Sequence, residues 1–288
     1  MIDKLNHAPL TVPNYSYVFN FEKNFVYSDA LPIITNHYPN CFYYSAIYAI
    51  LIFAGKHYMS NRPKFELRGA LALWNMLLAV FSIFGFLRMS AEMYHVLSYY
   101  GFYHSVCVPS FLTQDPVSAF WSLLFILSKI VEFGDTAFIV LRKQPLMFLH
   151  WYHHITVFLY AWLCFVETTA YARWNAVVNF FIHSWMYSYY ALKATRFHPP
   201  KWIAMLITTL QTLQMIWGCF VTIIAYSYVK NDQVECHVKL RNAQIGLLIY
   251  FSYFILFGRF FKQAYLSNKR GKKVEKKNDI NDKLIKTN

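Results

Sequence analysis

The chain has 288 residues, of which 57% are apolar, 20% aromatic and only 14% charged, and its formal net charge is +13. Soluble globular domains carry about 25% charged residues, so this composition excludes a disordered chain and a nucleic-acid-binding tail protein and argues against a soluble enzyme. The charges stand in short clusters between apolar runs, which is typical of membrane topology. The sequence therefore predicts an all-α polytopic membrane protein whose partner is the lipid bilayer and not a nucleic acid.

Seven windows are long and apolar enough to form membrane-spanning helices, each of which needs about 20 residues. In chain order the predicted spans are 40–57, 69–87, 118–141, 148–166, 174–192, 202–226 and 243–265. Residues 1–30 lack the apolar core of a cleavable signal peptide, and residues 1–39 are expected to form a lumenal segment. Residues 40–265 form one seven-helix domain, and residues 266–288 form a basic tail that we expect to be disordered.

The distribution of Lys and Arg predicts the orientation of the spans, because cytosolic loops carry the excess of positive charge. Nineteen Lys and Arg residues fall on the side of the C-terminal tail, in the connections around 56–68, 142–143 and 193–201 and from Arg259 onward. Seven fall on the other side, and Lys129 lies inside a span. The chain is thus predicted to have a cytosolic C-terminus and a lumenal N-terminus.

Two features belong to loops that this topology places in the lumen. The single Asn-x-Ser/Thr acceptor is Asn14-Tyr15-Ser16, a candidate glycosylation site. Cys107 and Cys236 both lie in lumenal loops, where a disulfide can persist; the alternative is two unpaired thiols. The remaining cysteines fall in or beside spans and are interpreted as small apolar packing residues: Cys41, Cys164 and Cys219.

The third span carries ionisable residues at membrane depth, where each costs about 2.5–3.5 kcal/mol on insertion scales. Lys129, Glu132, Asp135 and Thr136 recur at a spacing that puts them on one face of a helix. Such residues mark a functional site by default. The alternative is a structural pair in which Lys129 and Glu132 neutralise each other.

The fourth span begins with three histidines on one helical face: His150, His153 and His154. A single His in an apolar helix is usually a packed core residue, whereas three at this spacing indicate metal binding or proton and nucleophile chemistry.

Polar stripes continue in the next two spans. The fifth contains Asn179, His183, Met186, Tyr187 and Tyr190, and the sixth contains Thr208, Gln211 and Gln214. The glutamines alone are also consistent with ordinary interhelical hydrogen bonds. Because polar stripes on neighbouring helices converge on the bundle interior, the four stripes together predict the lining of an enclosed cavity.

These motifs resemble the ELO family of very-long-chain fatty acid elongases. The matching residues, in chain order, are Lys129, Glu132, Asp135 and Thr136; His150, His153 and His154; Asn179, His183, Met186, Tyr187, Tyr189 and Tyr190; and Thr208, Gln211 and Gln214. The resemblance covers about residues 40–265. Three further segments, 64–68, 81–85 and 149–154, are similar to the member-6 subgroup, which extends saturated and monounsaturated acyl groups.

The resemblance implies a very-long-chain 3-oxoacyl-CoA synthase of the endoplasmic reticulum membrane. It implies the first, condensing step of elongation, in which a long-chain acyl-CoA, straight or branched, reacts with malonyl-CoA to give a 3-oxoacyl-CoA, CO2 and CoA without a further cofactor or metal. It also implies seven helices, six around a closed acyl tunnel and one outside. The 3-oxoacyl-CoA reductase, dehydratase and enoyl reductase of the cycle are the implied partners, and a homodimer is compatible with the family.

Two mechanisms are open for the condensation. In the first, His153 attacks the thioester to give an acyl-imidazole, while His150 and His154 orient or deprotonate it and His183 with Asn179 stabilises the oxyanion. In the second, the His cluster acts as general base for direct condensation. In either case the supporting residues are Lys129, Glu132, Asp135, Tyr187, Gln211 and Gln214; the three ionisable ones are expected to hold the histidine face and neutralise the malonyl carboxylate.

Two rival functions account for part of the sequence. Membrane desaturases and hydroxylases also contain His-x-x-His-His, but their di-iron sites need more histidines than this box and His183 supply, which leaves a mononuclear metal site. A seven-helix transporter or receptor with Lys129 as its ligand contact leaves the histidine box without a role, and no matched pair of broken helices supports it.

Overall fold

The computed structural model describes residues 11–197, 199–231 and 235–267, and within these residues all regular structure is helical. The helices are α1 (Asn20–Lys23), α2 (Tyr27–His37), α3 (Asn40–Met59), α4 (Arg68–Tyr99), α5 (Gly101–Cys107), α6 (Ser110–Thr113), α7 (Pro116–Val131), α8 (Phe133–Leu141), α9 (Phe148–Val166), α10 (Ala172–Ala194), α11 (Lys201–Asn231), α12 (Leu240–Phe261) and the π-helical turn η2 (Lys262–Ser267). Six of the seven predicted spans correspond to α3, α4, α9, α10, α11 and α12, and the third to α7 plus α8. The predicted tail lies, from residue 268 on, outside the described residues.

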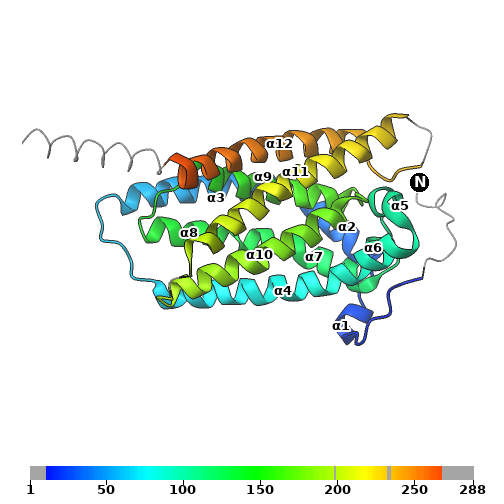
Figure 1. Ribbon diagram of the computed structural model, residues 1–288, viewed down its shortest axis with the longest axis horizontal. Helices are drawn as coiled ribbons and strands as arrows, with labels where there is room; N and C mark the ends of the chain where they lie inside the picture. Colours follow the sequence, from blue (N-terminus) through cyan, green and yellow to red (C-terminus); the bar gives the residue numbers. More distant parts are fainter. Residues whose placement is uncertain (1–10, 198, 232–234, 268–288) are drawn as a thin grey trace, which may run out of the picture.

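The long helices run side by side along the longest axis of the molecule (Figure 1). Helix α4 packs along α10, α10 along α11 and α11 along α12, while α12 contacts α9, α9 contacts α7 and α7 returns to α4. Helix α3 packs against α8 and α9 outside this circuit. The neighbours thus close a ring of helices with α3 on its outside.

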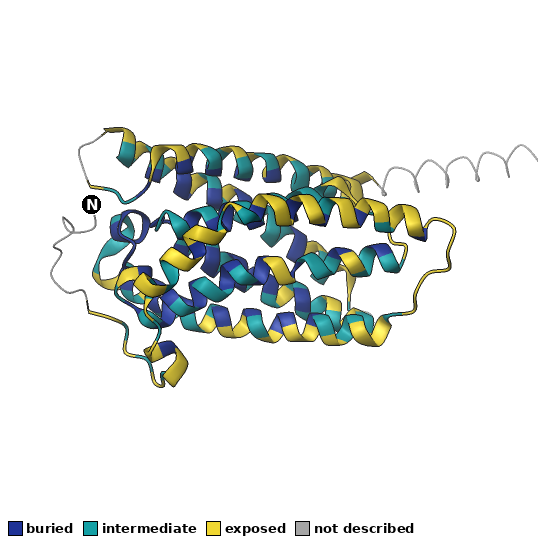
Figure 2. Ribbon diagram, turned by 180° about the vertical axis from the view of Figure 1, so that it is seen from behind, coloured by how far each residue is buried: buried dark blue, intermediate teal, exposed yellow. Residues whose placement is uncertain are grey.

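Exposed residues lie along the outer faces of the bundle (Figure 2), and many of them are large and apolar. Examples on four different helices are Leu51, Leu77, Ile216 and Leu248. By length and apolar composition, three of the described helices are able to cross a membrane: Arg68–Tyr99, Lys201–Asn231 and Leu240–Ser267. An apolar surface of this extent is not stable in water, so the chain is a multi-pass membrane protein.

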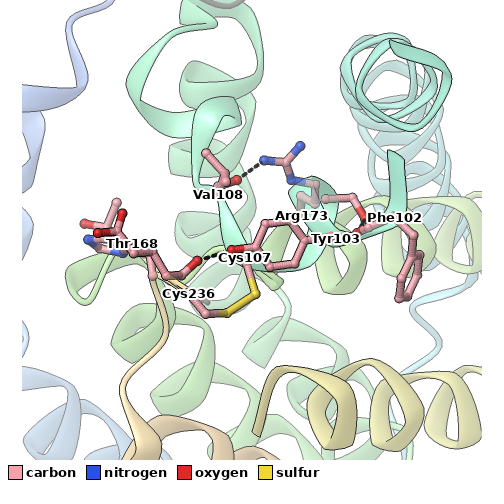
Figure 3. The surroundings of a disulfide bond; sticks show 10 residues. Phe102, Tyr103, Cys107, Val108, Thr168, Arg173 and Cys236 are labelled. Atoms are coloured by element: carbon pink, nitrogen blue, oxygen red, sulfur yellow. Dashed lines mark hydrogen bonds between the residues drawn. A yellow bond between two sulfur atoms is a disulfide. The ribbon is translucent and has the colours of Figure 1, made fainter. Parts of the chain in front are cut away.

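The two ends of the bundle differ in their connections (Figure 1). At one end lie the α3–α4, α8–α9 and α10–α11 connections, which carry most of the described Lys and Arg clusters; we call this the basic end. At the other lie α1, α5, α6 and the α11–α12 connection. There Cys107, at the end of α5, forms a disulfide with Cys236, and we call this the disulfide end (Figure 3).

Helix α4 extends well beyond its predicted bounds for an electrostatic reason. Helix α4 continues to Tyr99, twelve residues past the predicted end at 87. The predicted end falls just before Arg88, whose guanidinium forms an ion pair with the buried Glu22. Arg173 likewise pairs with Glu92 at 2.8 Å. Pairing offsets the cost of burying these charges, so the helix continues.

The third predicted span is interrupted between α7 and α8. The amide of Asp135 donates to the carbonyl of Glu132, three residues back, at 3.1 Å, which is the tighter 3₁₀ pattern. Close packing accompanies this turn, because a Cβ on Gly134 would lie 2.5 Å from the ring of Trp74. The interruption changes which partners the polar residues on either side of it face.

Candidate active site

A cavity of about 340 Å³ lies inside the ring of helices toward the basic end. Its lining includes all four histidines singled out above, three from the first turns of α9 and His183 from α10. We call it the histidine cavity. Of the supporting residues, Glu132, Asp135, Tyr187, Gln211 and Gln214 also line it, as does Asn179. Four predicted stripes therefore meet at one cavity.

Lys129 lies behind the lining and connects two helices. Its ammonium donates to Glu132 Oε1 at 2.7 Å and to Asn179 Oδ1 at 2.9 Å, and the side chain is 2% exposed. The ring of Phe125 lies under it, with the ammonium 4.4 Å from the centroid. Lys129 thus ties α7 to α10 and holds Asn179 in place.

The hydrogen bond between Lys129 and Asn179 determines which ring nitrogen of His183 carries the proton. An ammonium can only donate, so the Asn179 carbonyl oxygen faces Lys129 and the amide nitrogen faces His183 Nε2, at 3.2 Å. The Nε2 atom therefore accepts, and the proton of a neutral His183 lies on Nδ1. Nδ1 in turn faces Glu132 Oε1 at 3.8 Å. Glu132, Lys129 and Asn179 together orient one imidazole.

The three histidines of the box have different surroundings. His150 Nε2 lies 2.9 Å from Thr136 Oγ1, and the same hydroxyl lies 2.7 Å from the Tyr48 hydroxyl. His154 is buried, with its ring 4.4 Å from that of His150 and 6.5 Å from that of Phe133. These two imidazoles are packed into the helix interface.

His153 differs from His150 and His183 in that it lines the cavity with ring nitrogens that have no hydrogen-bond partner among the described residues. Its ring packs 4.8 Å from the ring of Tyr253 on α12. Among the described residues, no hydrogen bond is made by its ring nitrogens, whereas His150 and His183 each make one. His153 lines both the histidine cavity and the apolar pocket beyond it, so its nitrogens are available to a molecule that enters either space.

Asp135 and Thr136 do not share a partner with Lys129 and Glu132, although the sequence predicts one common face. Asp135 accepts hydrogen bonds from Trp74 Nε1 at 2.7 Å and from the Tyr187 hydroxyl at 2.8 Å. The turn between α7 and α8 separates the two pairs. Trp74 and Tyr48 were absent from the sequence-based site, because they stand on α4 and α3 with no polar stripe around them to mark their role.

The glutamines on α11 complete the cavity wall. Gln211 Nε2 lies 3.2 Å from the Met186 sulfur. Gln214 lines both the histidine cavity and the apolar pocket. Their amides face the space in front of the histidines, where they can bind a polar group of a ligand.

A basic mouth opens next to the histidine cavity at the basic end. This hollow of about 670 Å³ is lined by Arg68, Leu71, Asn75, Arg142, Gln144, Tyr190, Lys193, Ala194 and Arg196. It shares Asn75, Arg142 and Tyr190 with the histidine cavity, so the two spaces adjoin. Guanidinium and ammonium groups in this number suit phosphate and carboxylate ligands.

An apolar pocket adjoins the histidine cavity on its other side. It shares His153, Asn179, Gln214 and Met215 with that cavity and continues toward the disulfide end between aromatic and aliphatic side chains. Basic mouth, histidine cavity and apolar pocket follow one another along the bundle. This order of basic, polar and apolar spaces matches a ligand with an anionic head, a reactive centre and a hydrocarbon tail.

In the described part of the chain, no group of three His, Cys, Asp or Glu side chains is arranged to share an ion. The box histidines face Thr136, Tyr253 and Phe133 respectively.

The two predicted lumenal features lie at the disulfide end. The structure joins Cys107 and Cys236, the two cysteines paired by the sequence analysis, with a Cα–Cα distance of 4.3 Å. Asn14 is exposed in the segment before α1, so its side chain is accessible to a modifying enzyme. In the amino-acid sequence, both features are well separated from the histidine box.

Comparison with known proteins relates the whole arrangement to one family. The model described as "ELO: GNS1/SUR4 family" matches residues 33–273. Very long chain fatty acid elongase 6 of Drosophila melanogaster is 53% identical over 256 residues, which cover 88% of this chain and 81% of that protein. Very long chain fatty acid elongase 6 of Homo sapiens is 44% identical over 266 residues (92% and 98%), and that of Mus musculus 43% over 272 residues (94% and 100%).

Proposed function

The chain belongs to the ELO (GNS1/SUR4) family and is a fatty acid elongase, and from that premise we propose that it condenses acyl-CoA with malonyl-CoA through an acyl group held on His153. The enzyme is a very-long-chain 3-oxoacyl-CoA synthase, in agreement with the sequence analysis. We further propose saturated and monounsaturated long-chain acyl-CoAs, straight or branched, as its substrates, because the relatives cited above are elongases 6.

The observation that carries the mechanism is the unpaired imidazole of His153 between the histidine cavity and the apolar pocket. An acyl-CoA with its tail in the apolar pocket and its CoA in the basic mouth places its thioester next to this side chain. His183 is less suited to attack, because the Asn179 amide covers its Nε2 atom. His183 instead orients the Asn179 amide, whose second hydrogen is the donor that we propose for charge on the thioester oxygen.

The proposed reaction has two steps, acylation of His153 and condensation with malonyl-CoA. A nitrogen of His153 attacks the thioester carbon, the C–S bond breaks, and the imidazole proton goes to the CoA thiolate, which leaves as CoA. Malonyl-CoA then loses CO2, and the enolate so formed attacks the acyl carbon. The C–N bond breaks, the 3-oxoacyl-CoA is released, and His153 takes up one proton from solvent.

The malonyl carboxylate needs a different partner from the one that the sequence analysis suggested. Lys129 already binds Glu132 and Asn179 and is not part of the cavity lining. Of the described residues that line the histidine cavity, Arg142 is the only Lys or Arg. We assign the carboxylate to Arg142, at the junction with the basic mouth.

The proposed setting is the endoplasmic reticulum membrane, with the basic end in the cytosol and the disulfide end in the lumen. A disulfide at Cys107 and Cys236 supports this orientation, because such bonds persist in oxidising compartments. The 3-oxoacyl-CoA needs two reductions and a dehydration before the next cycle, so a 3-oxoacyl-CoA reductase, a dehydratase and an enoyl reductase are the expected partners. A homodimer remains part of the proposal.

The test is the intact mass of the purified, metal-stripped protein after incubation with palmitoyl-CoA alone. We expect a gain of one palmitoyl group, followed by loss of the adduct and formation of the 3-oxo product when malonyl-CoA is added. The His153→Ala variant is expected to form no adduct and to lose at least about a hundred-fold in rate. His57→Ala, at an exposed histidine of α3, is the matched control and is expected to behave as wild type.

Each other outcome selects another mechanism. Normal condensation without an adduct contradicts the acyl-imidazole and favours direct condensation with the histidines as general base. Activity that returns only when metal is added contradicts both and favours a metal enzyme.

A further inference from the structure

An amide group on the wall of the apolar pocket has no partner among the described residues. Asn175 on α10 lines this pocket on the same helical face as Ala172, Ala176 and Asn179. Its side chain is half-buried and forms no hydrogen bond with the described part of the chain. Asn175 is not part of the lining of the histidine cavity. Its two N–H donors and its carbonyl acceptor are therefore available to a molecule in the apolar pocket.

The asparagines that are fully buried elsewhere in the bundle are hydrogen-bonded. Asn75 donates to a carbonyl of its own helix at 2.7 Å, and Asn242 donates to the Glu167 carboxylate at 2.7 Å. Asn179 accepts from an ammonium at 2.9 Å. An amide without a partner in an apolar site is destabilising, and most buried polar groups in native proteins have one. We therefore expect the partner of the α10 amide to come from the ligand.

The other polar groups of the pocket do not supply this partner. The Ser122 hydroxyl donates to a carbonyl of its own helix at 2.7 Å, and the Tyr160 hydroxyl lies 2.6 Å from the hydroxyl of Tyr171. His153 and Gln214 lie where the pocket joins the histidine cavity. The free amide on α10 thus lies deeper than the reacting groups, among side chains that are apolar or already paired.

Helix α10 gives the position of this amide along a bound acyl chain. Asn179 is the residue that we place beside the thioester, and Asn175 lies four residues nearer the disulfide end, which is about 6 Å at a rise of about 1.5 Å per residue. An extended hydrocarbon chain, with C–C bonds of about 1.52 Å in a zigzag, advances roughly 1.25 Å per carbon. The amide therefore lies beside about the sixth carbon, counted from the thioester carbon. A methylene there leaves the amide unpaired, whereas a hydroxyl can both accept from it and donate to it.

We propose that Asn175 is a specificity-determining residue, which admits acyl chains with a hydroxyl group near the sixth carbon as a further class of substrate. The proposal rests on the proposed function, because the apolar pocket is taken as the acyl site. A hydroxyl at this carbon exchanges its hydrogen bonds with water for bonds with the amide. A hydroxyl at a distant carbon enters an apolar part of the pocket and loses its bonds with water without replacement.

The test measures kcat/KM for condensation with palmitoyl-CoA, 6-hydroxypalmitoyl-CoA and 12-hydroxypalmitoyl-CoA as separate substrates. We expect wild type to prefer the 6-hydroxy over the 12-hydroxy isomer at least about ten-fold, because a site that pairs a substrate hydroxyl discriminates strongly against a chain without one at that place. In Asn175→Leu, which has a side chain of similar size, the ratio of 6-hydroxypalmitoyl to palmitoyl is expected to fall at least about ten-fold. The ratio of 12-hydroxypalmitoyl to palmitoyl is expected to stay the same.

Asn36→Leu is the matched control, the same substitution at an exposed position of α2, and is expected to keep the wild-type ratios. A wild-type protein that does not condense palmitoyl-CoA contradicts the proposed function. A wild type that condenses palmitoyl-CoA but treats the two hydroxy isomers alike overturns the role of Asn175 and leaves the proposed function standing. Unchanged ratios in Asn175→Leu, or an equal change in Asn36→Leu, overturn that role as well. Where Asn175→Leu fails to fold, Asn175→Ala removes the amide without adding bulk, and unchanged ratios in that variant overturn the proposal.

Discussion

At the scale of single residues, the site is organised by what each polar group is already bound to. Lys129, Glu132 and Asn179 satisfy one another and leave His183 with a defined tautomer. His153 remains without a hydrogen-bond partner among the described residues, and of the four histidines that line the cavity it is the one that also lines the apolar pocket. Residues with internal partners orient the site, and His153 is the residue that we assign to the chemistry.

The position of Arg142 leads to a prediction about substrate binding. Replacing it in Arg142→Gln is expected to raise the KM for malonyl-CoA about ten-fold or more, because a charge-assisted hydrogen bond contributes about 1.5–3 kcal/mol. The effect is expected in KM and not in kcat, since the ion pair forms before CO2 is lost. Steady-state kinetics with each substrate varied in turn measures it.

Arg68→Gln is the matched control for this prediction. Arg68 lines the basic mouth but not the histidine cavity, so its loss is expected to affect malonyl-CoA and acyl-CoA alike through their common CoA group. Equal changes of both KM values in Arg142→Gln contradict the assignment of Arg142 to the malonyl carboxylate.

At the scale of helices, close packing depends on small residues at particular positions. A Cβ on Gly85 of α4 would lie 2.5 Å from the ring of Phe180 on α10. Phe180 in turn packs with Phe81, Trp121 and Phe125, and Phe125 lines the apolar pocket. The α4–α10 contact therefore supports the pocket wall.

Gly85→Val is expected to destabilise the protein by about 1–3 kcal/mol, the usual cost of forcing extra volume into a packed interface. The midpoint of thermal unfolding in detergent, followed by tryptophan fluorescence, measures this. Gly69→Val introduces the same side chain on the same helix, at a position where a Cβ meets nothing within 4 Å, and should leave the midpoint nearly unchanged. Equal shifts in both variants would show that the effect is one of helix propensity and not of packing.

The sequence predicts helices and polar stripes better than it predicts their ends and their partners. The box at His150, His153 and His154 and the stripe at Asn179 and His183 are visible because helical periodicity alone brings their members together. The continuation of α4 depends on Arg88 meeting Glu22, 66 residues away in the chain. Asp135 has Trp74 and Tyr187 as its partners, and these contacts depend on how α4 and α10 pack. Such long-range pairings leave no trace in the local pattern.

At the scale of the whole molecule, the two ends are chemically distinct. The basic end carries the mouth and the disulfide end carries Asn14 and the Cys107–Cys236 bond. The positive-inside rule assigns the first to the cytosol. An oxidising lumen is the compartment in which the second can keep its disulfide. The charge distribution and the redox chemistry thus favour the same orientation.

This orientation can be measured with a membrane-impermeant maleimide on sealed microsomes. A cysteine at the exposed Lys64, in Lys64→Cys, is expected to be labelled without detergent. A cysteine at the exposed Tyr17, in Tyr17→Cys, is expected to react only after detergent opens the vesicles. Wild type is the control for its own thiols, of which Cys41 and Cys164 are buried. Labelling in the reverse order would contradict the assignment of the basic end to the cytosol.

The order of basic mouth, histidine cavity and apolar pocket bears on how successive elongation cycles follow one another. With the mouth as the proposed entrance, the acyl chain goes in methyl end first and the product withdraws along the same path. We therefore expect distributive elongation, in which each two-carbon addition is a separate encounter and every chain of intermediate length competes afresh with all others in the membrane.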